Sequence, residues 1–287
     1  MFRTLSPLRS ATVFYLLAFA MVVAVALTGG TTAAAMLTPA VATLLMLLLI
    51  TRDGWTRQGW ASLGLHRLGL RLWPVAILVP ILIVAAGAVV VVATDAAHWQ
   101  APEQANDYPV WTMPAFLLAN IAYASVTVTL TEEIGWRGYL LPRLTRLGAR
   151  PAMLLSGLLH GIWHLPVMLL TSLYHPVGSR LVVVPMFLVA VTALGVFYGW
   201  LRMQTGSVWP AVLAHSANNV AVVWMSSLVA GDAVTIQYIA GEGAITTAAY
   251  GAIAVGLLMR ANGRQSMAAR NASTTADLAQ PVPAAGR

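Results

Sequence analysis

The chain has 287 residues, of which 59% are hydrophobic and only 9% are charged. Because a soluble globular domain carries about 25% charged residues, this composition indicates a membrane protein. The chain contains no cysteine, which excludes disulfides, thiolate metal ligands and cysteine nucleophiles. The formal net charge is +7, but the arginines flank apolar segments, as membrane topology signals do. We therefore expect the lipid bilayer as a partner and no nucleic acid.

The sequence contains eight apolar segments close to the length of about twenty residues that a helix needs to cross a hydrocarbon core. Such segments must be helical, because backbone groups in lipid have no water to bond to. The first segment is longer than the apolar stretch of a signal peptide, so we expect it to remain uncleaved. The sequence thus predicts an all-α polytopic membrane protein with about eight transmembrane helices, at approximately residues 11–29, 33–51, 72–94, 113–131, 151–171, 181–201, 208–229 and 243–260.

The arginines fall almost entirely on one side of this arrangement, and Arg180 is the exception. They precede the first span and follow the second, fourth, sixth and eighth spans, with Arg137 among those that follow the fourth. The positive-inside rule then predicts that both termini are cytoplasmic. We expect a multi-pass protein of the plasma membrane.

The apolar segments end near residue 260, which predicts one transmembrane helical domain over residues 1–260. Within it, residues 113–230 hold the polar clusters described next. Residues 261–287 are rich in Ala, Ser, Thr and Pro with scattered Arg, which predicts a disordered cytoplasmic tail. Residues 95–111 are polar with interspersed Trp and Pro, and we expect an external loop there.

The first polar cluster is the stretch Glu132-Glu133-Ile134-Gly135-Trp136-Arg137. Glu133 and Arg137 are four residues apart, so one helical face can hold them as an ion pair. Glu132 points about 100° away from that face and is available for another partner. The structural alternative is a cytoplasmic helix end with ordinary surface charge.

Two further clusters lie inside predicted spans. His160 and His164 share one face of the fifth span, and His215 and Asn219 share one face of the seventh. A structural alternative applies here too, because His and Asn side chains can join membrane helices by hydrogen bonds. Ionisable groups at membrane depth are costly, however, and usually mark function or a partnered structural site.

Taken together, the three clusters supply the groups that hydrolysis needs. Glu132 and His164 could hold a water molecule between them and take its proton. His215 and Asn219 could donate hydrogen bonds to the oxyanion of a tetrahedral intermediate.

The ordered set of clusters resembles the CPBP family of CAAX prenyl endopeptidases and bacteriocin-processing or immunity proteins, also called the Abi family. The family pattern is Glu-Glu-x-x-x-Arg, then x-x-x-His, then His-x-x-x-Asn, on successive transmembrane helices. It is carried here by Glu132, Glu133, Arg137, His164, His215 and Asn219, within roughly residues 113–230. The chain departs from the pattern at His160, where the family commonly has an aromatic residue such as Phe.

The resemblance implies an intramembrane endopeptidase that hydrolyses a peptide bond of a membrane-associated peptide or protein. Glu132 and His164 would activate water, and His215 and Asn219 would form the oxyanion site. Glu133 and Arg137 would support Glu132. The resemblance also implies a cavity within the membrane, formed by the motif-bearing helices and opening toward the cytoplasmic side.

A zinc-dependent mechanism is the first alternative. His160 and His164 have the spacing of the zincin helix, but Gly161 stands where that motif has its glutamate. His160, His164 and His215 would supply the three protein ligands of a catalytic zinc. We favour a mechanism without a cofactor because the first motif is intact and His160 is not part of the family pattern.

Two alternatives come from other functional classes. The chain could be a non-catalytic immunity or membrane-assembly protein with the same fold. It could also be a proton-coupled transporter with a relay of intramembrane carboxylates and histidines, although the sequence lacks the internal repeat that many transporters have.

Overall fold

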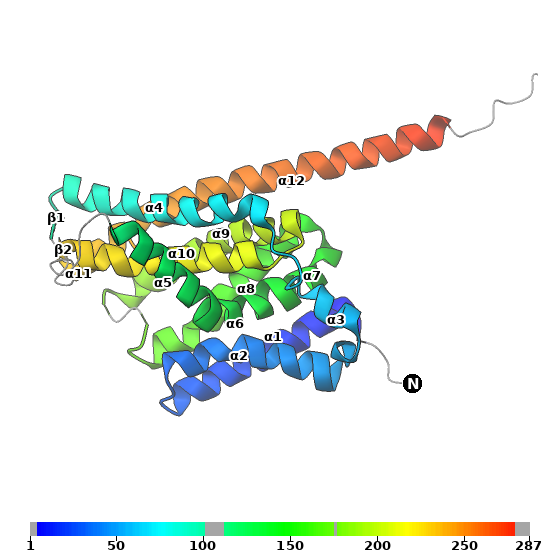
Figure 1. The fold of residues 1–287 in the computed structure, drawn as a ribbon, viewed down its shortest axis with the longest axis horizontal. Helices are drawn as coiled ribbons and strands as arrows, with labels where there is room; N and C mark the ends of the chain where they lie inside the picture. Colours follow the sequence, from blue (N-terminus) through cyan, green and yellow to red (C-terminus); the bar gives the residue numbers. More distant parts are fainter. Residues whose placement is uncertain (1–4, 101–111, 175–176, 279–287) are drawn as a thin grey trace, which may run out of the picture.

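The computed structural model of the chain describes residues 5–100, 112–174 and 177–278. These residues form an all-α bundle with one short antiparallel sheet (Figure 1). The α-helices are α1 (Pro7–Leu27), α2 (Thr32–Leu45), α3 (Arg57–Ser62), α4 (Trp73–Ala93), α5 (Met113–Ala124), α6 (Leu130–Glu133), α7 (Leu141–Leu144), α8 (Ala149–Leu170), α9 (Arg180–Thr205), α10 (Trp209–Leu228), α11 (Ala233–Ile239) and α12 (Ala244–Leu278). The all-α prediction is confirmed.

Shorter helical segments extend or connect these helices. Three are π-helical: η1 (Met46–Ile50), η6 (Ser125–Thr129) and η7 (Ile134–Leu140). Three are 3₁₀ turns: η2 (Asp53–Trp55), η3 (Leu70–Leu72) and η8 (Thr145–Leu147). Strand β1 (Ala97–Trp99) pairs with β2 (Val229–Gly231), with His98 opposite Ala230. This pairing falls partly within the loop expected at residues 95–111, of which residues 101–111 lie outside the described part of the chain.

Within the described part of the chain, seven helical segments are long and apolar enough to cross a membrane. They are Pro7–Leu27, Thr32–Ile50, Leu70–Ala93, Met113–Leu147, Ala149–Leu170, Arg180–Thr205 and Ala233–Ala261. The seventh predicted span, residues 208–229, exists as helix α10 but is not among these seven. Its polar side chains lower its hydropathy, and most of its residues are buried, as it packs against α4, α5 and α9. A helix surrounded by other helices does not need an apolar surface of its own.

The fourth predicted span was expected to end at residue 131, but the helix continues to Leu147. The first polar cluster therefore lies inside a continuous helix and not at a helix end. Arg137, which we assigned to a cytoplasmic loop, is fully buried. That assignment was wrong, because an arginine with an acidic partner on its own helix can be buried in the bundle.

Helix α12 runs past Ala261 to Leu278. The disordered tail expected over residues 261–287 stays a prediction. Alanine and arginine favour helix, and the first proline after the eighth predicted span is Pro281. Figure 1 shows this part of α12 extending beyond the bundle.

Figure 1 shows the two ends of the bundle. One end carries α3, α7 and the start of α1, and we call it the arginine-rich end because most of the loop arginines lie there. The other end carries β1, β2 and α11, and we call it the sheet end.

Two glycines bring α8 and α9 together near the middle of the bundle. A Cβ atom on Gly195 would lie 2.2 Å from the Cα of Gly157, and a Cβ on Gly157 would lie 2.6 Å from the carbonyl oxygen of Thr192. Small residues allow helix backbones to approach this closely in membrane proteins. Arg137 lies beside this contact, because a Cβ on Gly195 would be 3.1 Å from its Nη2 atom.

Candidate active site

The three polar clusters meet at a cavity of about 240 Å³ inside the bundle. Each cluster contributes to its wall, through Glu132, His160 and His164, and His215 and Asn219. The rest of the lining is mainly apolar or aromatic and includes Met36, Tyr174, Phe187, Val191, Leu194, Tyr198, Val222 and Val223. The sequence predicted these clusters on separate helices, and the tertiary structure brings them together.

The lining reaches Tyr174, between α8 and α9, and Glu242, between α11 and α12. The cavity thus extends from the middle of the bundle away from the arginine-rich end. The opening toward the cytoplasmic side that the resemblance implied stays a prediction.

Glu133 and Arg137 form the predicted ion pair. Arg137 Nη1 donates a hydrogen bond of 2.9 Å to Glu133 Oε1, and both side chains are fully buried. The Arg137 guanidinium also lies over the ring of Tyr198, 5.2 Å from its centroid. A buried guanidinium needs such compensation because removing a charge from water is costly.

The helix around this pair is π-helical, and a side chain from another helix bonds to its backbone there. The backbone N–H of Leu141 donates to the carbonyl of Trp136, five residues earlier. The carbonyl of Arg137 instead accepts a hydrogen bond of 3.1 Å from Arg202 Nε of α9. Side-chain insertion of this kind widens a helix locally, and π-helical turns are frequent at functional sites.

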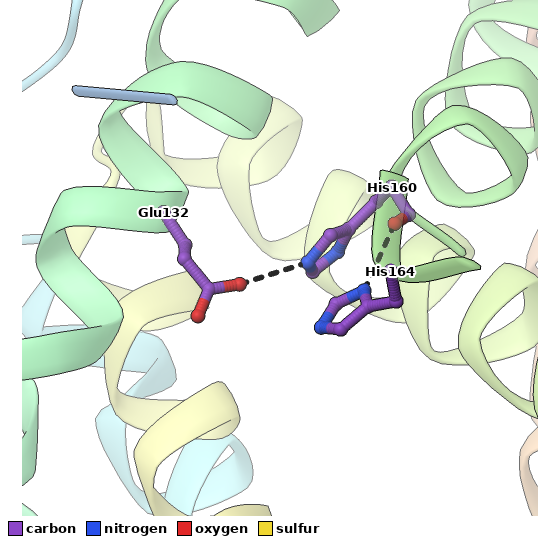
Figure 2. A group of neighbouring side chains, drawn as sticks. All are labelled: Glu132, His160 and His164. Carbon is purple, nitrogen blue, oxygen red and sulfur yellow. Dashed lines mark hydrogen bonds and ion pairs between the residues drawn. The ribbon is translucent and has the colours of Figure 1, made fainter. Parts of the chain in front are cut away.

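Glu132 points to a different partner, as its position on the helix predicted. Its Oε2 atom lies 3.0 Å from His160 Nε2, and both side chains are buried (Figure 2). We expected Glu132 to share a water molecule with His164, four residues further along α8. The structure places His160 directly against the carboxylate and His164 beside it.

His164 is held by its own helix. Its Nδ1 atom donates to the carbonyl oxygen of His160 at 3.0 Å (Figure 2). A carbonyl can only accept, so Nδ1 carries the proton and Nε2 carries the lone pair in neutral His164. His164 is therefore oriented as a base.

His215 contacts the other glutamate. Its Nδ1 atom lies 3.0 Å from Glu133 Oε1, the same oxygen that accepts from Arg137. Its ring stacks on Tyr198 at 5.7 Å between centroids. Asn219, one turn further along α10, also lines the cavity.

Glu132, His160 and His164 form a group that could hold a metal ion. One carboxylate oxygen and one ring nitrogen from each histidine lie within 4.8 Å of one another. The zinc alternative instead named His160, His164 and His215. Within the described residues His215 lies against Glu133. The possible metal-binding group therefore contains Glu132 where the zinc alternative had His215.

The sequence reasoning missed the hydroxyl groups that join the first and third clusters. Ser216 of α10 contacts Ser125 Oγ at 2.9 Å and Thr129 Oγ1 at 2.5 Å. Both partners lie in the π-helical segment η6 just before the two glutamates. Ser125 and Thr129 are four residues apart, which indicates that they share one helical face. Only the tertiary structure shows that Ser216 lies against that face.

The chemical inventory of the cavity suits hydrolysis. It combines a buried carboxylate, a histidine with an oriented lone pair, and hydrogen-bond donors on a third helix. Its apolar walls suit a hydrophobic substrate segment.

Residues 114–221 match the family model described as Type II CAAX prenyl endopeptidase Rce1-like. The match confirms the resemblance that the polar clusters indicated, and it runs from α5 into α10. It includes every residue predicted for the site: Glu132, Glu133, Arg137, His160, His164, His215 and Asn219. No curated protein matches the chain.

Proposed function

We propose that the chain is an intramembrane endopeptidase that hydrolyses a peptide bond of a membrane-associated peptide or protein with water activated by Glu132 and His164. The match to type II CAAX prenyl endopeptidases supports this reaction class. The observation that carries the proposal is the convergence of Glu132, His164, His215 and Asn219 on one cavity.

The separation of the first two groups suits a single water molecule. A carboxylate oxygen of Glu132 and a ring nitrogen of His164 lie within 4.8 Å of each other. A water molecule that makes two hydrogen bonds of about 2.8 Å can bridge such a gap. Attack of its oxygen on the substrate carbonyl transfers a proton to Glu132 or His164, and that proton then passes to the leaving amine.

His215 and Asn219 face the same cavity and can stabilise the oxyanion. With Nδ1–H bound to Glu133, a doubly protonated His215 presents Nε2–H to the substrate oxygen, and the Asn219 amide adds a second donor. The negative charges of the two carboxylates are then balanced by the positive charges of Arg137 and protonated His215. Such a balance favours ionised groups inside a low-dielectric bundle.

The first experiment is hydrolysis by purified full-length protein in nanodiscs. The probes are a defined library of quenched hydrophobic peptides and a farnesylated CAAX peptide, in water enriched in ¹⁸O. We expect ¹⁸O in one new carboxyl terminus, and a rate about 10²- to 10⁴-fold lower for Glu132→Gln. The matched control is Asp95→Asn, an exposed position at the sheet end. Equal rates for Glu132→Gln and the wild type would overturn the mechanism.

A zinc-dependent hydrolase of the same substrates is the second candidate. The observation that favours it is the close grouping of Glu132, His160 and His164. Elemental analysis of the purified protein tests it, because stoichiometric zinc that is lost together with hydrolysis in His164→Ala would identify a metalloenzyme. We favour the mechanism without metal because of the hydrogen bonds of His160 described next.

A further inference from the structure

We infer that His160 is a positioning residue that accepts a hydrogen bond from Arg137 at Nδ1 and donates one from Nε2 to Glu132, so that it orients the carboxylate and does not bind a metal ion. The role of Glu132 in this inference rests on the proposed function. The hydrogen-bonded state of His160 does not depend on it.

The tautomer of His160 follows from the chemistry of its two neighbours. Arg137 Nη1 lies 3.1 Å from His160 Nδ1. A guanidinium has only donors, so Nδ1 must be the acceptor and carries the lone pair. The single proton of the neutral ring is then on Nε2, which lies 3.0 Å from Glu132 Oε2. A carboxylate accepts that hydrogen bond.

The result is a continuous chain of buried hydrogen bonds between the two glutamates. Arg137 Nη1 contacts both Glu133 and His160, and His160 contacts Glu132. Each of the four residues is at most 3% exposed. Hydrogen bonds between buried groups polarise one another and are strengthened by the low local dielectric, so the charge of Arg137 acts on Glu132 through the imidazole.

Neighbouring rings fix the plane of the imidazole. Trp136 stacks on His160 with 5.1 Å between centroids and 28° between planes, and Trp163 lies 6.0 Å away. Gly157, one turn before His160 on α8, brings α8 against α9. The ring therefore occupies the place of an aromatic side chain and adds two directed hydrogen bonds, which a phenylalanine at this position lacks.

These hydrogen bonds conflict with a zinc ligand at this position. A histidine ligand binds the metal through an unprotonated nitrogen. In His160 the unprotonated nitrogen faces Arg137, and the nitrogen that faces Glu132 carries the proton. Zinc between Glu132 and His160 would require loss of the Nε2 proton or displacement of Arg137 from Nδ1. The close grouping of the three side chains is therefore explained by hydrogen bonds alone.

The first test is ¹⁵N NMR of the full chain labelled at histidine, with His160 assigned by its absence in His160→Gln. We expect a protonated Nε2 and an unprotonated Nδ1 for His160, and the reverse pattern for His164. We also expect that added zinc leaves the His160 signals unchanged. A protonated Nδ1 on His160, or a zinc-induced shift of the His160 and His164 signals together, would overturn the inference. This test needs no substrate, so its failure is distinct from a failure of the proposed function.

The second test compares two substitutions in the hydrolysis assay. A glutamine side chain can accept from Arg137 through its carbonyl oxygen and donate to Glu132 through its amide, whereas phenylalanine keeps only the ring. We expect His160→Phe to lower kcat about 10- to 100-fold with little change in KM, and His160→Gln to recover most of the loss. The control is His98→Phe in strand β1, at an exposed position. Equal kcat for His160→Phe and the wild type, or equal losses for Phe and Gln in proteins of wild-type Tm, would contradict the positioning role.

Discussion

Two adjacent glutamates occupy different environments because they project about 100° apart from one helix. Glu133 lies against Arg137 and His215, while Glu132 lies against His160 at the cavity wall. Burial of both is compatible with the fold because each carboxylate accepts a hydrogen bond from a partner on the described helices. We propose that Glu132 performs chemistry and Glu133 fixes the groups around it.

The stability of the bundle should depend on Arg137 more than on any surface arginine. Arg137→Leu leaves Glu133 buried without its arginine partner, and breaking a buried pair in this way costs about 3–5 kcal/mol. We expect a large fall in Tm by thermal unfolding in detergent. Arg146→Leu, at an exposed position, should change Tm little.

A double variant separates loss of the pair from loss of packing. Adding Glu133→Gln to Arg137→Leu removes the uncompensated carboxylate, so we expect part of the lost stability to return. If Arg137→Leu alone unfolded with the Tm of the wild type, the ion pair would contribute nothing to the fold.

At the scale of helices, close approach and irregular segments position the site. Gly157 and Gly195 bring α8 and α9 together, and the π-helical segment η7 directs Arg137 toward α8. Gly135 has a similar role on the other face, since a Cβ there would lie 2.6 Å from Pro39 Cβ of α2. The first polar cluster is therefore packed tightly between α2 on one face and α8 and α9 on the other.

Gly195→Ala should separate α8 from α9. Its Cβ would lie 2.2 Å from Gly157 Cα and 3.1 Å from Arg137 Nη2, so the backbones must move apart. Overpacking of this kind costs about 1–3 kcal/mol. We expect a lower Tm together with slower hydrolysis, because His160 moves relative to Glu132.

The matched control for this variant is Gly256→Ala in α12, where a Cβ meets no atom within 4 Å. That change should leave Tm unchanged or raise it slightly, because alanine favours helix over glycine. Equal changes in Tm for the substitutions at positions 195 and 256 would show that the close contact between α8 and α9 does not contribute to stability.

At the scale of the molecule, charge is separated between the two ends of the bundle. The loop arginines gather at the arginine-rich end, while the cavity lining reaches Glu242 toward the sheet end. The positive-inside rule predicts that the arginine-rich end is cytoplasmic. The cavity would then be approached from the membrane or from the opposite side.

The absence of native cysteine makes this orientation directly testable. Gln58 lies at the arginine-rich end, and Thr94 lies at the sheet end, both exposed. In intact cells a membrane-impermeant maleimide should label Thr94→Cys and should label Gln58→Cys only after lysis. Glu242→Cys should behave as Thr94→Cys does. The reverse pattern would mean that the arginines do not set the topology.

The sequence by itself determined the features that depend on local chemistry. Hydropathy and the solvation of backbone groups in lipid fixed the helical class and the approximate position of each long helix. Spacing along a helix gave the Glu133–Arg137 pair and the separate direction of Glu132, and it identified the motif residues that the family match contains.

Only the tertiary structure decided which groups from different helices meet. The sequence could not rank His160 above His164 as the partner of Glu132, because that choice depends on how α8 is rotated and on how closely Gly157 lets it approach α9. The burial of Arg137 likewise involves other helices, since Arg202 of α9 donates a hydrogen bond to the Arg137 carbonyl. The local sequence determines the chemistry that a side chain can perform. Packing between distant segments determines which other side chain it contacts.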